Sequence, residues 1–140
     1  MRLYLDANTI IYSVEAVAGF QAGVLRWVQQ VEAAAGLLIT SRLSLLECRV
    51  QPLRQGDHET LARYDELFSG ANLVLLDVSS DVIDQATELR ARYGFRSADA
   101  IHLATAILIG AEVFLTADAG LSRCTEIRVV TLTAEPNMTS

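Results

Sequence analysis

Five short apolar runs, separated by amphipathic stretches, are the feature that most constrains the fold of this 140-residue chain. The runs fall at residues 2–5, 37–40, 73–76, 112–116 and 128–132. Such short, continuously apolar runs are typical of strands buried on both faces within a parallel sheet. Because helical patterns lie between them, we predict an α/β fold, a three-layer α/β/α sandwich with a central, mainly parallel sheet of four to five strands.

The stretches between the apolar runs predict helices, since their apolar residues recur every three or four positions. The first helix is expected to start near Thr9, where polar residues can accept the free N–H groups of a helix start. Pro52 is expected to disturb the end of its helix, and Ser97 to cap the next one. Further helices are expected at residues 21–35, 41–51, 58–68, 80–93 and 98–109, with a short one after Asp118.

The length of the chain suits one domain, which would bury roughly 70% of the surface of its unfolded chain. We expect this single domain to span residues 1–134. Residues 135–140 contain a proline close to the end of the sequence and are expected to form a frayed tail.

The charged residues exclude several classes of function. All eleven cations are Arg, and the absence of Lys argues against a P-loop nucleotide site and against Schiff-base chemistry. The net charge of −6 argues against a polybasic, nonspecific nucleic-acid binder. Aromatic residues make up only 6% of the chain, which argues against base-stacking platforms.

Nothing in the sequence indicates secretion or a membrane. Two cysteines, Cys48 and Cys124, are too few for a disulfide framework or a four-cysteine zinc site. No apolar segment typical of a signal peptide precedes the first charges. Residues 100–117 are apolar, but polar residues interrupt them, and the pattern predicts a buried helix and strand. We therefore expect a cytoplasmic protein that does not associate with membranes.

Four acidic residues occupy positions where ligand sites form in parallel α/β proteins. Asp6 follows the first predicted strand and Asp118 closely follows the fourth, so both should lie at the carboxyl edge of the sheet. Asp99 lies in the first turn of an apolar helix, and Glu47 lies in a helix with apolar neighbours. Each has an ordinary explanation, as a helix cap, a partner of the helix dipole or a solvated residue. Together they would repel one another unless a divalent cation such as Mg²⁺ or Mn²⁺ lay between them.

The segments around these acids resemble the PIN-domain family, particularly the VapC-like toxin ribonucleases. They read LDANTII at residues 5–11, LLE at 45–47, SADAIHLATA at 97–106 and LTADAGL at 115–121, so the resemblance covers essentially the whole chain. It implies metal-dependent hydrolysis of RNA phosphodiester bonds. The catalytic and metal-binding acids of the family would then be Asp6, Glu47, Asp99 and Asp118, with Asn8, Ser97 and Thr116 as supporting polar residues.

The arginines bear on how a phosphate would bind. Six of the eleven flank two of the acids in sequence, namely Arg42, Arg49, Arg54, Arg90, Arg92 and Arg96. A guanidinium group can bind two phosphate oxygens at once, and we expect Arg49 and Arg96 to contact substrate. The alternative is ordinary surface charge, with helix pairs such as Glu88 and Arg92.

The resemblance also implies partners, namely a cognate antitoxin and a second copy of the chain in a homodimer. A phosphatase of the haloacid-dehalogenase type is disfavoured because Asn8 stands where it needs a second Asp, and the required Lys is missing. A response-regulator receiver is disfavoured in the same way. The remaining alternative is a PIN fold that binds RNA or protein without turnover. His102 is expected to be a hydrogen-bonded core residue rather than a general base.

Overall fold

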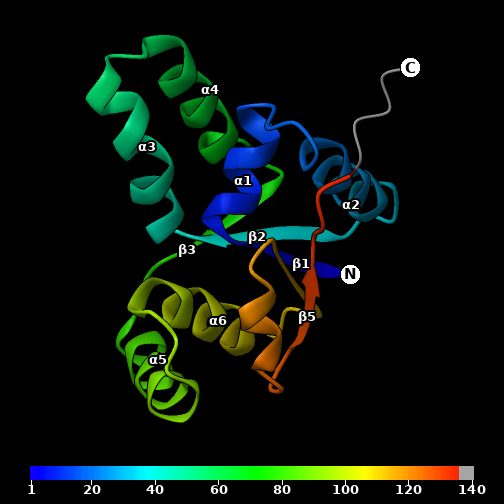
Figure 1. Ribbon diagram of the computed structural model, residues 1–140. Helices are drawn as coiled ribbons and strands as arrows, with labels where there is room; N and C mark the ends of the chain where they lie inside the picture. Colours follow the sequence, from blue (N-terminus) through cyan, green and yellow to red (C-terminus); the bar gives the residue numbers. More distant parts are fainter. Residues whose placement is uncertain (136–140) are drawn as a thin grey trace.

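The computed structural model describes residues 1–135, and within them the five predicted strands form one sheet in which all strands run parallel (Figure 1). The strand order is β3-β2-β1-β4-β5, with each neighbouring pair in parallel register. The strands are β1 (Arg2–Leu5), β2 (Leu37–Ser41), β3 (Leu73–Leu76), β4 (Val113–Thr116) and β5 (Arg128–Thr131).

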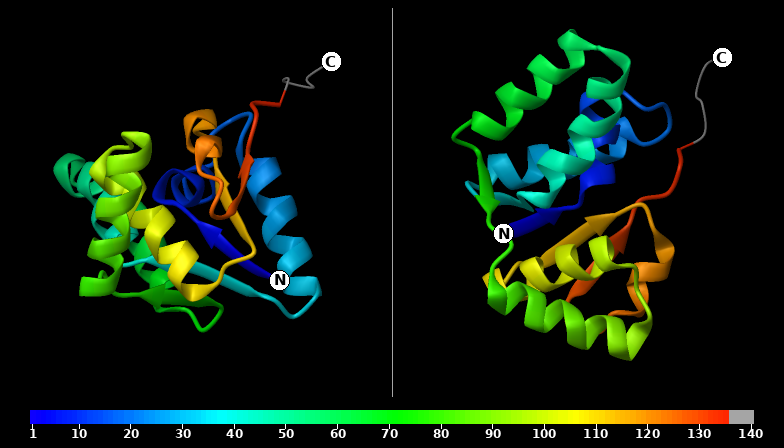
Figure 2. Two further views of the ribbon diagram at one scale, coloured as in Figure 1. Left: turned by 90° about the horizontal axis from the view of Figure 1, so that it is seen from below. Right: turned by 90° about the vertical axis from the view of Figure 1, so that its left-hand side faces the viewer.

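Helices cover both faces of this sheet, which confirms the predicted α/β/α sandwich (Figure 2). On one face lie α1 (Ala7–Val14), α2 (Gln21–Ala33), α3 (Leu43–Gln55) and α4 (His58–Ser69). On the other lie α5 (Ser80–Tyr93), α6 (Ser97–Ile109) and the short 3-10 helix η1 (Ala119–Arg123).

The alternation of side chains along β1 shows how the sheet separates two hydrophobic cores. Leu3 and Leu5 pack into the core beneath the α1–α4 layer, whereas Tyr4 packs into the core beneath α5 and α6. All three are buried because successive side chains of a strand point to opposite faces, and here both faces are covered.

The order of the strands reverses at β1, and this reversal determines where a site can form. From β1 the chain passes through α1 and α2 to β2, which lies on one side of β1. From β3 it returns through α5 and α6 to β4, which lies on the other side of β1. Leu5 of β1 pairs with Leu115 of β4, so the carboxyl ends of these two strands are adjacent. A crevice outside such a reversal point is where open α/β sheets bind ligands.

The helix predicted at residues 41–51 differs from the structure at both ends. Ser41 belongs to β2, and α3 continues through the buried Pro52 to Gln55. Pro52 removes one helical N–H, but the following turn is closed by the Gly56 and Asp57 amides, which donate to Leu53 and Pro52. Gly56, with a φ of +65°, then ends the helix in the left-handed conformation that glycine adopts readily.

The capping role predicted for Ser97 is wrong. Arg96 occupies the N-cap position with an extended backbone, and Ser97 is the first helical residue of α6. No side chain caps this helix start. Smaller differences are that α1 begins at Ala7 rather than near Thr9, and that α2 ends at Ala33.

The end of the described chain is anchored. The Glu135 amide donates a 2.8 Å hydrogen bond to the Gly19 carbonyl, and its carboxylate pairs with Arg26 on α2. The frayed tail was predicted for residues 135–140, of which residues 136–140 lie outside the described part. No helix within residues 1–135 is long and apolar enough to cross a membrane.

Candidate functional site

A buried hydrogen-bond network joins the carboxyl ends of β1 and β4. The Thr116 hydroxyl, at the end of β4, donates to Oδ2 of Asp6 at 2.7 Å. The same hydroxyl accepts a hydrogen bond from the Asp118 amide at 3.1 Å. Thr116 is fully buried and Asp6 is 7% exposed. The network therefore holds Asp6 and the backbone of Asp118 together at the point where the strand order reverses.

Asp6 is also the N-cap of α1, as its sequence position predicted. Its Oδ1 accepts hydrogen bonds from the Thr9 amide at 3.0 Å and from the Thr9 hydroxyl at 2.7 Å. Asp118 plays the corresponding part for η1, where its Oδ1 accepts from the Gly120 amide at 2.9 Å. The role of Thr9 in fixing Asp6 was not predicted, although a Thr three residues after a capping Asp was a usable signal.

Glu47 lies on α3 and contacts the opposite helical layer. Its Oε1 lies 2.6 Å from Nε2 of His102 on α6, and Nδ1 of His102 lies 2.7 Å from the Tyr4 hydroxyl. His102 is 2% exposed, so the prediction of a hydrogen-bonded core histidine is confirmed. The contact between His102 and Glu47 was not predicted, because 55 residues separate the two in sequence.

Asp99, in the first turn of α6, accepts a 3.1 Å hydrogen bond from Nε of Arg96. This bond and the charge of Asp99 raise the pKa of the Arg96 guanidinium, and the charges of Asp118 and Glu47 add to the effect. The charges of Asp6 and Glu47 likewise add to the burial that raises the pKa of the Tyr4 hydroxyl. Each of the four acids thus contributes to the raised pKa of Arg96 or of Tyr4.

These acids have few counterions. Within residues 1–135, the ion pairs of the four acids are Arg96 with Asp99 and, when the imidazole is protonated, His102 with Glu47. No cationic side chain of the described residues lies within 4 Å of the Asp6 or Asp118 carboxylate. Carboxylate and hydroxyl oxygens are donors that Mg²⁺ and Mn²⁺ prefer, so the chemistry of the donor set fits a hard divalent cation.

The acids are not arranged as an assembled coordination shell. Among residues 1–135, no three His, Cys, Asp or Glu side chains are close enough together to form a metal-binding group. Hydrogen bonds to protein groups hold the carboxylates of Asp6, Asp99 and Glu47. The structure therefore provides oxygen donors along one edge, and their assignment as metal ligands stays a prediction.

Apart from the buried Thr116, the other predicted site residues are exposed. Asn8, Ser97 and Arg49 are exposed, and the Arg96 side chain is 80% exposed. Nε of Arg49 donates to the Leu45 carbonyl one turn earlier in α3, at 3.1 Å. Arg42 and Arg92 pair with Asp77 and Glu126, so the suggested pair of Glu88 with Arg92 is not formed. Two of the six flanking arginines thus form surface ion pairs away from the four acids.

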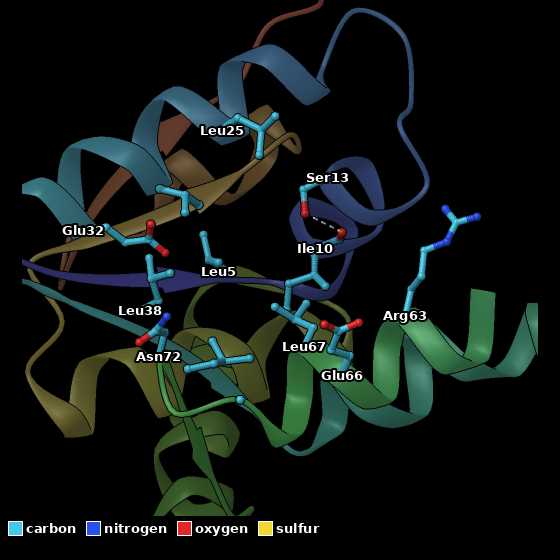
Figure 3. A pocket seen from close by; sticks show the side chains of 13 residues that line it. Leu5, Ile10, Ser13, Leu25, Glu32, Leu38, Arg63, Glu66, Leu67 and Asn72 are labelled. Carbon is cyan, nitrogen blue, oxygen red and sulfur yellow. Dashed lines mark hydrogen bonds between the residues drawn. The ribbon is translucent and has the colours of Figure 1, made fainter. Parts of the chain in front are cut away.

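A separate cavity lies under the α1–α4 layer (Figure 3). It has a volume of about 420 Å³, and residues from α1, α2, α4 and the sheet line it, among them Ile10, Leu25, Leu38 and Leu67. Its rim carries Glu32, Arg63 and Glu66, but none of the four acids lines it. A mainly apolar hollow of this kind suits an apolar side chain rather than a phosphate.

Comparison with known proteins identifies the fold independently. The family model of the PIN domain matches residues 3–127. No curated protein sequence shows a significant match to the chain.

Several solved structures share the fold. A structure of VapBC2 from Rickettsia felis bound to a promoter DNA fragment superposes with a TM-score of 0.79 at 16% identity, covering 95% of this chain and 100% of that one. DNA-bound VapBC from Salmonella typhimurium gives 0.76 at 17% identity, covering 95% and 99%. VapC20 from Mycobacterium tuberculosis, a toxin that cleaves the sarcin-ricin loop, gives 0.70 at 17% identity, covering 90% and 98%. At these identities the likeness shows the fold.

Proposed function

This chain belongs to the PIN-domain family, and on that premise we propose that it is a divalent-metal-dependent endoribonuclease, the toxin of a toxin–antitoxin pair. The observation that carries the proposal is the Asp6–Thr116–Asp118 network at the reversal point of the sheet. Through Thr116 the network holds Asp6 and the backbone of Asp118 at one edge of the sheet, and no cationic side chain of the described residues pairs with either carboxylate. A divalent cation bound at this edge would offset the repulsion among the acids.

Asp6, Asp99 and Asp118 would hold the metal directly or through water, and Glu47 would be a further ligand or would orient the attacking water. A bound Mg²⁺ or Mn²⁺ supplies a water of lowered pKa and offsets charge on the phosphate and the leaving oxygen. Thr116 fixes one oxygen of Asp6 through its hydrogen bond. The exposed Asn8 and Ser97 would bind metal-coordinated water.

Arginines near the acids would bind the phosphate groups of the RNA. The exposed Arg96 guanidinium already lies beside Asp99, and Arg49 lies on α3 two residues after Glu47. The net charge of −6 does not prevent RNA binding, because two divalent cations would reduce it to about −2. Attack by water rather than by the 2′-hydroxyl would leave a 5′-phosphate on the product.

A cognate antitoxin is the proposed protein partner. Several structural neighbours are toxin–antitoxin complexes, among them one from Klebsiella pneumoniae. Apolar side chains of such a partner would fit the cavity lined by Ile10 and Leu67, while another part of the partner would mask the acids. Co-expression with the product of a small neighbouring gene should give a stable complex without cleavage activity. Homodimerisation stays a prediction. The mass of the complex in solution would test both whether an antitoxin binds and whether two copies of this chain are present.

Cleavage of a mixed pool of single-stranded RNA tests the proposed activity. The wild type should cut the pool with Mg²⁺ or Mn²⁺ and stop when EDTA is added. Asp99→Asn should lose about 100-fold or more of the rate, because several kcal/mol of charge stabilisation is removed. Asp84→Asn, an exposed acid on α5, serves as the control and should cut normally. RNA binding without cleavage under any divalent metal would instead favour a binding module without turnover.

A further inference from the structure

We infer that His102 is a positioning residue: held by Tyr4, it donates the proton on Nε2 to Glu47 and so orients the Glu47 carboxylate for the acidic edge. The inference rests on the proposed function, since Glu47 is one of the acids assigned there. It adds two residues, Tyr4 and His102, that do not themselves touch metal or substrate.

The geometry forms an uninterrupted chain from the core to the site. The Tyr4 hydroxyl lies 2.7 Å from Nδ1 of His102, and Nε2 of His102 lies 2.6 Å from Oε1 of Glu47. Tyr4 is fully buried and His102 is 2% exposed, whereas the Glu47 side chain is 31% exposed. The three residues come from β1, α6 and α3, so the chain joins the sheet to both helical layers.

The position of the protons follows from the geometry around Tyr4. A tyrosine hydroxyl, with an ordinary pKa of about 10, keeps its proton at neutral pH. The ring of Tyr4 is fixed by stacking on Phe114, with centroids 5.2 Å apart. When this hydroxyl donates to Nδ1 of His102, the ring proton of a neutral imidazole lies on Nε2, facing Glu47.

This arrangement orients Glu47 without neutralising it. A neutral imidazole N–H fixes one carboxylate oxygen, whereas an Arg in its place would bring a full positive charge. Within residues 1–135, Oε2 of Glu47 has no hydrogen-bond partner, so that oxygen is available to a cation or to the attacking water. A rigid, buried donor suits this role because it holds the Glu47 rotamer before any ligand arrives.

Two measurements test the inference, and neither depends on cleavage. Binding of Mn²⁺ to the apo protein can be followed by the electron paramagnetic resonance signal of the free ion. His102→Leu removes the donor and should weaken Mn²⁺ binding about 10- to 100-fold. His102→Gln should restore binding to within about threefold, because its amide can donate to Glu47 and accept from Tyr4. Leu103→Val, which trims the same helix in the same core, is the control and should bind as the wild type does.

The second measurement is the ¹⁵N NMR spectrum of the imidazole rings. The chain has two histidines, and a His58→Ala variant identifies the signals of His102. The spectrum should show a protonated Nε2 and an unprotonated Nδ1 in the wild type. Tyr4→Phe should produce a mixture of the two neutral tautomers, since the donor that selects one of them is gone.

The outcomes separate this inference from the proposed function. A wild type that binds Mn²⁺, with His102→Leu binding equally well, would overturn the positioning role and leave the proposed function standing. A His102 protonated on Nδ1 in the wild type would overturn it too. A wild type that binds no Mn²⁺ at all would contradict both proposals.

Discussion

The Thr116 hydroxyl at the end of β4 donates a 2.7 Å hydrogen bond to Oδ2 of Asp6, which lies 110 positions earlier at the end of β1. The same hydroxyl accepts from the Asp118 amide. A single side-chain oxygen thus links two of the four acids through neighbouring strands. Because Thr116 and Asp6 are both buried, the relationship is part of the core as well as of the candidate site.

Replacing this hydroxyl should therefore affect both stability and activity. Thr116→Val keeps the shape of the side chain but leaves the Asp118 amide and one Asp6 oxygen without a partner. The free energy of unfolding should fall by about 1–3 kcal/mol, and cleavage should fall about 10- to 100-fold. Urea unfolding and an RNA cleavage assay measure the two effects. Thr131→Val serves as the control, since Thr131 on β5 pairs with Thr116 in the sheet, and it should change neither stability nor cleavage by much. Equal effects of the two variants would contradict a special role of Thr116.

Two substitutions of Asp6 separate its capping role from its proposed chemistry. Asn remains a good N-cap, but its amide nitrogen cannot accept the proton of the Thr116 hydroxyl, so Asp6→Asn should lose only part of the stability that Asp6→Ala loses. Asp6→Ala loses the bonds from both Thr9 and Thr116 and should cost about 2–4 kcal/mol. Both variants should lose cleavage and Mn²⁺ binding, because the charged oxygen donor is gone in each. An Asp6→Asn protein that cuts RNA like the wild type would show that capping is the whole role of this residue.

Stability should fall in alkaline solution because two buried groups hold their protons more tightly in the folded state. Burial, chiefly, raises the pKa of the Cys48 thiol from 9.0 to about 12, and it raises the pKa of the Tyr4 hydroxyl above its ordinary 10.0. Below pH 9 each group is protonated in both the folded and the unfolded state, so pH has no effect through them. Above its ordinary pKa the unfolded chain releases a proton that the folded chain keeps, and each group then lowers stability by about 1.4 kcal/mol per pH unit.

Urea unfolding at pH 8, 9, 10 and 11 measures this dependence. The chain has no Lys, so that range of pH is free of lysine titration. Cys48→Ala should reduce the slope that begins near pH 9. A free energy of unfolding that stays constant up to pH 11 would contradict the burial argument for both groups.

The sheet could be predicted from the sequence because its signal is local. Each strand is a short apolar run, and the predicted bounds differ from those observed by one residue at most, as at Ser41 and Leu132. The caps at Asp6 and Asp118 could be predicted for the same reason, since a capping residue and its helix are adjacent in the chain.

The features that the sequence did not predict depend on tertiary contacts. The helix α3 continues past Pro52 because the following turn is closed by backbone bonds ending at Asp57. The contact of His102 with Glu47 requires α3 and α6 to meet at the edge of the sheet, and no local sequence pattern predicts such a contact. The anchoring of Glu135 depends on Arg26, which is 109 positions away.

The most direct test of the proposed metal site is a crystal of the protein soaked in Mn²⁺, with anomalous diffraction used to locate the ion. We expect a peak at the carboxyl ends of β1 and β4, with oxygen atoms of Asp6, Asp99 and Asp118 coordinating the ion directly or through water, the direct bonds being about 2.1 Å long. Small rotations of these side chains would complete the shell. A peak elsewhere, or none in a crystal that holds high Mn²⁺, would contradict a metal-dependent site at this edge.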